Sequence, residues 1–258
     1  MAIAQKKRTK SESFFSEDQL LSLQENPVPH HIAIIMDGNR RWAKQRGLPI
    51  KMGHWEGAET LTDAVEAASA LGVKTLTVYS FSTENWGRAQ EEIEALMQLF
   101  STYLRLKKSS MVRDGVRLDT IGDLSRFPQE VRGAFQSTKE ATSHCKKINL
   151  VLAMNYGGRD EIRRTFVKML QENKNLHVNP EQITEDLIAK HLDTMPWGDP
   201  ELLIRTSGEM RVSNFLLWQM SYAEIYMTEK LWPDFTPKDL FEAIVSFQKR
   251  GRRLGEGG

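Results

Sequence analysis

Short apolar runs alternate with helical patterns along most of this chain. The run His31–Met36 is rich in β-branched residues and shows no polar alternation, which is typical of a strand buried on both faces. Between the first two runs, Ala58, Leu61 and Val65 follow helical spacing. This alternation predicts a mostly parallel sheet with helices on both faces. We expect strands at 31–36, 75–81, 116–121, 148–154, 202–205 and 225–228, and helices near 58–71, 93–104, 128–144, 159–173, 181–192 and 237–250.

The domain organisation follows from length and patterning. At 258 residues the chain can form one large core or two small domains. We see no internal repeat, low-complexity tract or linker after about residue 30, so we expect one domain over residues 27–258. Residues 1–26 are polar and predict a flexible N-terminal arm. Its apolar residues predict a short amphipathic helix, docked on the body or, alternatively, on a membrane surface: Phe14, Phe15, Leu20, Leu21 and Leu23.

Composition excludes several classes of protein. The net charge of +1 provides no global field that would favour nucleic acid. The lone cysteine, Cys145, excludes an intrachain disulfide and favours a reducing compartment. No apolar stretch approaches membrane-spanning length, and no hydrophobic signal core follows the basic start. We therefore expect a cytoplasmic protein.

A polar cluster follows the first apolar run directly. In open α/β sheets, ligands bind at the carboxyl ends of the strands. Gly38 allows close approach of the backbone to a ligand, and Arg40 and Arg41 offer forked donors for phosphate oxygens. Asp37 would repel a phosphate unless a cation such as Mg²⁺ lay between them. The cluster predicts a metal-bound phosphate or diphosphate site.

Four further polar segments lie at or near predicted strand ends, at 80–88, 155–159, 204–215 and 218–233. Taken singly, each has an ordinary explanation as a turn, a helix cap, a solvated arginine or a core tryptophan. Taken together they meet at one sheet edge, where Arg41, Arg88, Arg205 and Arg211 would face two anionic groups held side by side. Walker, dinucleotide, nucleophile-elbow and zinc motifs are absent from the sequence.

The segments HIAIIMDGNRRWA, SFSTENWGR, NYGGR and IRTSGEMRVSNFLLWQMSYAEIYMTEKLWPDF resemble, in this order, those of the cis-prenyltransferase family and its undecaprenyl diphosphate synthases. The resemblance runs from about His30 to Gly255. It implies a single α/β domain with a central six-stranded sheet, an interior hydrophobic tunnel and a homodimer. The helices near 58–71 and 93–104 would supply the tunnel walls.

The resemblance also implies a reaction. An allylic diphosphate, usually farnesyl diphosphate, loses diphosphate as isopentenyl diphosphate attacks its first carbon, with Mg²⁺ as cofactor. A proton then leaves, a cis double bond forms, and the cycle repeats. The expected product is undecaprenyl diphosphate, a lipid carrier for peptidoglycan precursors, and its release implies possible contact with the membrane. The alternatives are another product length, a non-catalytic partner subunit, or a phosphohydrolase or nucleotide-binding enzyme using the same crevice.

Roles for individual residues come from the same resemblance. It implies Asp37 and Asn85 as catalytic residues, and Asp37 and Glu224 as Mg²⁺ ligands. The segment 250–255 resembles a tail that can reach the partner subunit's site. The implied substrate-binding residues are Gly38, Asn39, Arg40, Arg41, Trp42, His54, Ser82, Thr83, Glu84, Trp86, Arg88, Arg205, Arg211 and Ser213.

Three positions depart from the family pattern. Ile50 stands where an arginine is frequent, so the chain lacks that phosphate contact at position 50, and Lys51 is the adjacent cation. Met210 stands where some members have a histidine, and Leu254 where an aromatic residue is common. The polar loop 82–92 predicts a mobile lid over bound substrate, or alternatively a static connection with Trp86 packed in the core.

Overall fold

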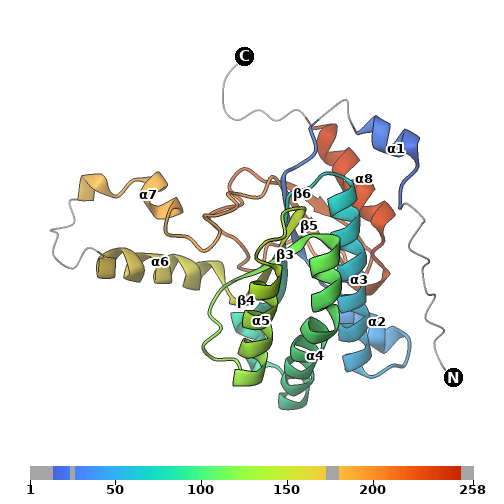
Figure 1. Cartoon of the computed structure of the whole chain (residues 1–258), viewed down its shortest axis with the longest axis horizontal. Coiled ribbons are helices and arrows are strands. Elements are labelled where there is room, and N and C mark those ends of the chain that lie inside the picture. The colour runs from blue at the N-terminus through green and yellow to red at the C-terminus, as the bar shows by residue number, and fades with distance from the viewer. Residues whose placement is uncertain (1–13, 24–26, 173–179, 251–258) are drawn as a thin grey trace.

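A six-stranded parallel sheet forms the centre of the computed structural model, which describes residues 14–23, 27–172 and 180–250 (Figure 1). The strand order is β3-β4-β2-β1-β5-β6, and every pairing is parallel. The predicted α/β class with a central, parallel six-stranded sheet is therefore confirmed. The strands are β1 (His31–Ile35), β2 (Thr75–Ser82), β3 (Val116–Ile121), β4 (Ile148–Tyr156), β5 (Leu202–Arg205) and β6 (Glu224–Met227).

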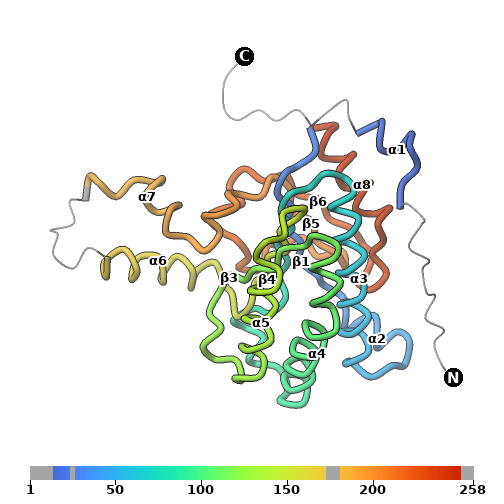
Figure 2. The backbone as a smooth tube through the Cα atoms, viewed as in Figure 1, coloured from blue at the N-terminus to red at the C-terminus, as the bar shows by residue number. Residues whose placement is uncertain are grey.

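Long helices pack beside this sheet, while α6 and α7 extend away from it (Figure 2). No helix within the described ranges is long and apolar enough to cross a membrane. The α-helices are α1 (Glu17–Ser22), α2 (Asn39–Gln45), α3 (Ile50–Ala70), α4 (Gln90–Asp114), α5 (Gln129–Thr142), α6 (Gly158–Glu172), α7 (Glu185–Ala189) and α8 (Pro237–Gln248), and the 3₁₀ turns are η1 (Thr83–Gly87), η2 (Pro180–Gln182) and η3 (Trp232–Asp234).

The two faces of the sheet are covered differently. Ile32 and Ile34 face the larger core, to which α3, α4, α5 and α8 contribute buried side chains. Ala33 and Ile35 face the smaller core, which is closed by side chains from residues 197–220. Apart from β5, that segment forms turns and irregular backbone rather than a helix. The prediction of helices on both faces was therefore wrong for the smaller core. An irregular segment with buried aromatic and aliphatic residues covers that face of the sheet instead.

The predicted helix over 181–192 is shorter than expected. Its main part begins only after Thr184, whose hydroxyl accepts a hydrogen bond from the Leu187 backbone amide at 3.2 Å and caps the helix. After Ala189 the chain continues in turns toward Pro196. A polar cap and a downstream proline thus limit a pattern that periodicity alone would extend.

The amphipathic helix expected near the N-terminus packs on the body. Phe15 and Leu23 are buried, and the Phe15 ring stacks on Phe241 with 5.8 Å between centroids. The side-chain amide of Gln248 donates to the Leu23 carbonyl at 3.1 Å. Residues 14–23 thus contact α8, whereas the rest of the predicted arm lies outside the described residues.

We expect Gly53→Ala to lower the free energy of unfolding. A Cβ at Gly53 would lie 2.1 Å from the Asn39 carbonyl oxygen, so α3 could not pack as closely on α2. Overpacking of this kind costs about 1–3 kcal/mol. Urea unfolding would measure the loss. The matched control is Gly133→Ala in α5, where nothing lies within 4 Å, and which should be neutral or stabilising. Equal stabilities of the two variants would contradict the close packing.

Acid should destabilise the protein through His31, whose imidazole contacts Thr77 and the Gly198 carbonyl. Burial lowers the pKa of His31 to about 4, against opposing effects of Gly198 and Glu201. The unfolded chain binds this proton near pH 6.5, so lowering the pH from 7 to 5 favours unfolding by about 2 kcal/mol. Urea titrations at both pH values would measure this loss, which should shrink in His31→Gln. An unchanged pH dependence in that variant would refute the assignment.

Candidate active site

The carboxyl ends of β1, β2 and β5 place three of the predicted segments at one edge of the sheet. Asp37 follows β1, and its backbone amide donates to the Thr206 hydroxyl at 3.0 Å. The Trp232 amide donates to the Asp37 carbonyl at 2.9 Å. The backbone around Asp37 is thus fixed from both sides, by the segment after β5 and by η3.

A buried ion pair lies at the centre of this edge. Arg205 is only 3% exposed, and its guanidinium donates to Asp37 Oδ2 at 2.9 Å and to Ser213 Oγ at 2.8 Å. It also donates to the Arg211 carbonyl. Ser213 adopts a left-handed backbone conformation with φ of 47°, which is uncommon outside glycine and typical of functional segments. The Asp37 side chain remains 33% exposed, so it also faces solvent.

Two polar pockets meet at Asp37. The first polar pocket has a volume of about 530 Å³, and the second polar pocket about 510 Å³. They share Met36, Asp37 and Arg88. The first is otherwise lined by Gly38, Asn39, Arg40, Arg41, Lys44, Leu48, Ile50 and His54, and the second by Ile35, Tyr79, Ser82, Glu84, Asn85, Ser213 and Asn214.

One buried carboxylate organises cations of the first polar pocket. Glu92, in the first turn of α4, lies 3.1 Å from His54 Nε2, 2.9 Å from Arg88 Nη1 and 3.6 Å from Arg40 Nε. Its side chain is 7% exposed. Burial lowers the pKa of His54, so its imidazole is neutral at pH 7. Burial also lowers the pKa of Arg88, whose charge is offset by Glu92.

A second carboxylate pairs with the remaining arginines. Glu209 Oε1 lies 3.0 Å from Arg41 Nη2, and Glu209 Oε2 accepts from Arg211. Arg41 also donates to the Ser207 carbonyl at 3.1 Å. Sequence reasoning did not select Glu92 or Glu209, because glutamates on a helix and in a polar loop normally indicate solvated surface. It also did not select Lys44, Tyr79, Ser207 and Asn214.

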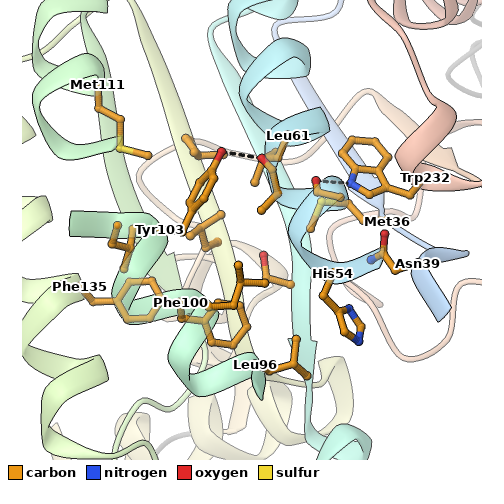
Figure 3. A pocket seen from close by; sticks show the side chains of 17 residues that line it. Met36, Asn39, His54, Leu61, Leu96, Phe100, Tyr103, Met111, Phe135 and Trp232 are labelled. Atoms are coloured by element: carbon orange, nitrogen blue, oxygen red, sulfur yellow. Dashed lines mark hydrogen bonds between the residues drawn. The ribbon is translucent and has the colours of Figure 1, made fainter. Parts of the chain in front are cut away.

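Next to the first polar pocket, an apolar cavity of about 80 Å³ lies between α3, α4 and the sheet (Figure 3). The two share Met36, Asn39 and His54. A smaller cavity of about 30 Å³ continues it, sharing Leu61, Tyr103, Met111 and Leu150. The Tyr103 hydroxyl and the Trp232 indole N–H donate to the Ala58 and Gly57 carbonyls of α3. Their polar atoms are thereby satisfied, and the cavity walls are mainly hydrocarbon and aromatic carbon.

Several predicted site residues do not line these pockets. The Trp42 indole is buried and donates to Asp234 at 2.8 Å. Trp86 packs on Phe81 and Phe127 and donates to Asn155 Oδ1, as the static alternative for the loop expects. Thr83 lies at the start of η1, outside both linings.

Glu224 lies at the opposite edge of the sheet from Asp37. It opens β6 and is in register with Leu202, whereas Arg205, at the other end of β5, pairs with Met227. Its carboxylate accepts from Arg250 at 2.7 Å. Within one chain, therefore, the structure does not bring the two predicted metal ligands together.

The structure also shows where two of the three departures from the family pattern lie. Ile50 lines the first polar pocket, and Lys44, rather than Lys51, supplies a further cation there. Lys51 faces a neighbouring groove between α3 and α4. The Met210 side chain is 85% exposed, and Leu254 lies outside the described residues together with the rest of the 251–258 tail.

Asp37 is the residue best placed to contact a metal ion. Within the described parts of the chain, no group of three or more His, Cys, Asp or Glu side chains is arranged to hold one. Mg²⁺ commonly binds through one or two carboxylates together with substrate phosphates. A partly exposed carboxylate where a pocket lined by several cations meets a second polar pocket therefore fits Mg²⁺ shared with a bound diphosphate.

Fold and site together define an α/β protein with two adjoining polar pockets beside an apolar cavity. A family model described as putative undecaprenyl diphosphate synthase matches residues 35–255. The isoprenyl transferase of Chlamydia muridarum is 47% identical over 91% of this chain and 94% of that protein. That of Clostridium perfringens is 46% identical over 93% and 94%.

Two solved structures are also similar to this chain over most of its length. Lavandulyl diphosphate synthase from Lavandula x intermedia, in complex with dimethylallyl diphosphate, has a TM-score of 0.85 and 36% identity over 89% of this chain and 99% of that one. A probable undecaprenyl diphosphate synthase from Campylobacter jejuni has a TM-score of 0.74 and 35% identity over 90% and 100%. The chain belongs to the undecaprenyl diphosphate synthase family and is a prenyltransferase.

Proposed function

We propose that this chain is a Mg²⁺-dependent cis-prenyltransferase that adds isopentenyl diphosphate units to farnesyl diphosphate and makes undecaprenyl diphosphate. The observation that carries the proposal is the meeting of two polar pockets at Asp37 and Arg88, with further cations lining the first pocket and an apolar cavity adjoining it. This arrangement suits one diphosphate with a hydrocarbon tail and a second diphosphate beside it. A structural relative was solved with an allylic diphosphate, dimethylallyl diphosphate.

The first polar pocket would bind the allylic diphosphate. Arg40, Arg41 and Lys44 surround it, and Gly38 precedes α2, whose N-terminal amides favour an anion. When the allylic C–O bond breaks, its electron pair moves to the leaving diphosphate. Fixed cations stabilise that developing charge without reorganising. Mg²⁺, held by Asp37 and diphosphate oxygens, would supply further charge neutralisation.

The second polar pocket would bind isopentenyl diphosphate. Ser213 lines it, with Arg205 and Arg211 close by, while Ser82 and Asn85 lie on its other side. Binding there would bring the reacting double bond next to the allylic carbon, because both pockets share Asp37 and Arg88. New bond formation uses the electrons of that double bond, and loss of a proton then restores an alkene.

The growing chain would enter the apolar cavity past Asn39 and His54. Its present volume of about 80 Å³ is far below the roughly 300–1,000 Å³ that enclose a drug-sized ligand. The predicted tunnel would therefore form only as side chains of α3 and α4 move apart. Product length would depend on how far that opening extends between these helices.

The experiment that tests this function is direct. Purified protein is incubated with farnesyl diphosphate, labelled isopentenyl diphosphate, Mg²⁺ and detergent, and the extracted products are separated by chain length. Undecaprenyl diphosphate is expected. Release of inorganic phosphate without chain growth would instead indicate a phosphohydrolase, and a folded but inactive protein would indicate a non-catalytic subunit. A product of another length would contradict only the proposed chain length, and would mean that the cavity opens further or less far than proposed.

We expect Asp37→Asn to lower turnover by about 100-fold or more, since it removes the charge that would hold Mg²⁺ against the diphosphates. The fold should be retained, as judged by circular dichroism. Glu130→Gln, an equal change of charge in an exposed pair with Arg105, is the matched control and should remain active. A near-normal rate for Asp37→Asn with the same Mg²⁺ requirement would disprove this role.

We also propose that the enzyme is a cytoplasmic homodimer that contacts the membrane when product leaves. The α6 helix extends from the body and exposes Phe166, Val167 and Leu170 by 44%, 41% and 62% (Figure 1). Apolar side chains grouped on one helix are typical of a subunit interface.

A double change of Phe166 and Leu170 to serine should convert a dimer to a monomer, because it removes apolar area from the proposed interface. Light scattering after size-exclusion chromatography would measure the mass. Leu106→Ser, which alters a 63% exposed leucine on α4, is the control and should leave the dimer intact. A double variant that remains dimeric would place the interface elsewhere.

A further inference from the structure

Glu209 connects the two groups of substrate-binding arginines. Its Oε1 lies 3.0 Å from Arg41, which lines the first polar pocket. Its Oε2 accepts from Arg211, whose carbonyl in turn accepts from Arg205 beside the second polar pocket. Each carboxylate oxygen therefore neutralises an arginine assigned to a different diphosphate.

The environment of Glu209 differs from that of Glu92. The Glu209 side chain is 29% exposed, against 7% for Glu92. The loop before it is anchored, since Ser207 N donates to the Lys230 carbonyl at 2.7 Å and Gly208 N to the Thr228 carbonyl at 2.9 Å. Glu209 can therefore leave its arginines by side-chain rotation, with the loop base fixed, whereas Glu92 is enclosed.

The charge of Glu209 persists at neutral pH. Hydrogen bonding and proximity to Arg211 lower the pKa of Glu209, and Arg41 adds to the effect. A diphosphate that approaches Arg41 or Arg211 therefore meets a carboxylate already bound there. The carboxylate and the diphosphate would repel each other on one guanidinium, so Glu209 opposes binding of the diphosphate.

We propose that Glu209 is an internal counter-ion that competes with diphosphates for Arg41 and Arg211, and so keeps inorganic diphosphate from staying bound. This inference rests on the proposed function, in which every addition of a five-carbon unit releases one inorganic diphosphate into a pocket built to bind it. A competing carboxylate weakens binding of that product, and the pocket is cleared for the next cycle.

The test is the affinity for inorganic diphosphate, measured by isothermal titration calorimetry on the full chain without Mg²⁺. Glu209→Gln keeps the shape and removes the charge. We expect it to bind inorganic diphosphate about three- to tenfold more tightly than the wild type, given the modest strength of exposed ion pairs. The difference should shrink at high salt, where such pairs are screened. A merely damaged site would lose affinity rather than gain it.

Glu229→Gln is the matched control. The Glu229 carboxylate lies beside Gly208 but has no lysine or arginine partner in the part of the chain that the structure describes. Unchanged or weaker binding by Glu209→Gln would overturn the proposal, and so would equal tightening in both variants, which would indicate a general charge effect. The titration measures binding of inorganic diphosphate, whereas the product assay measures chain growth. Failure of this inference can therefore be distinguished from failure of the proposed function.

Discussion

The site depends on the buried ion pair between Arg205 and Asp37. The Arg205 guanidinium is 3% exposed, so its charge needs a partner, and removal of Asp37 would leave that charge uncompensated. Its Nε is buried without a hydrogen-bond partner among the described residues. The planar fork of Arg205 joins the end of β5 to Asp37 after β1 and to Ser213 in the following loop. Three segments are thereby held at fixed spacing. The adjoining positions of the two polar pockets follow from this one contact, because Asp37 lines both.

The cations in this crevice repel one another before substrate binds, so their charges need partners within the protein. Two glutamates provide those partners in different ways. Glu92 is enclosed and joins Arg40, His54 and Arg88, so it preorganises groups from α2, α3 and the loop before α4. Glu209 is partly exposed and can be exchanged for a ligand anion. Stability of the empty site and affinity for diphosphate are thus opposed at Glu209, whereas the enclosed Glu92 stays in place and fixes the groups around it.

Much of the fold could be predicted from the sequence because the strands are short β-branched runs with clear ends, and the bounds of β3 and β5 agree with the prediction. Convergence of the polar segments followed from the geometry of parallel sheets. What could not be predicted depends on tertiary context. A motif does not reveal register, so the sequence carried no sign that Glu224 opens β6 and lies, within one chain, at the opposite edge from Asp37. Nor does it reveal direction, so the sequence left open whether Trp86 faces the site or packs in the core, where its ring contacts Phe127.

The boundary between charge and hydrocarbon defines what the site can do. His54 and Asn39 line both the first polar pocket and the apolar cavity, so a ligand that fills both would place its junction of diphosphate and hydrocarbon beside them. His54 is neutral there, because burial lowers its pKa. The Asn39 Oδ1 atom is buried without a partner among the described residues, which is costly unless a ligand or water supplies a donor. The apolar side of this boundary is closed by side chains rather than by backbone, so it can open as a chain lengthens. The charged side is fixed by Arg205 and Glu92, so the reacting carbon can stay in one place while the product grows away from it.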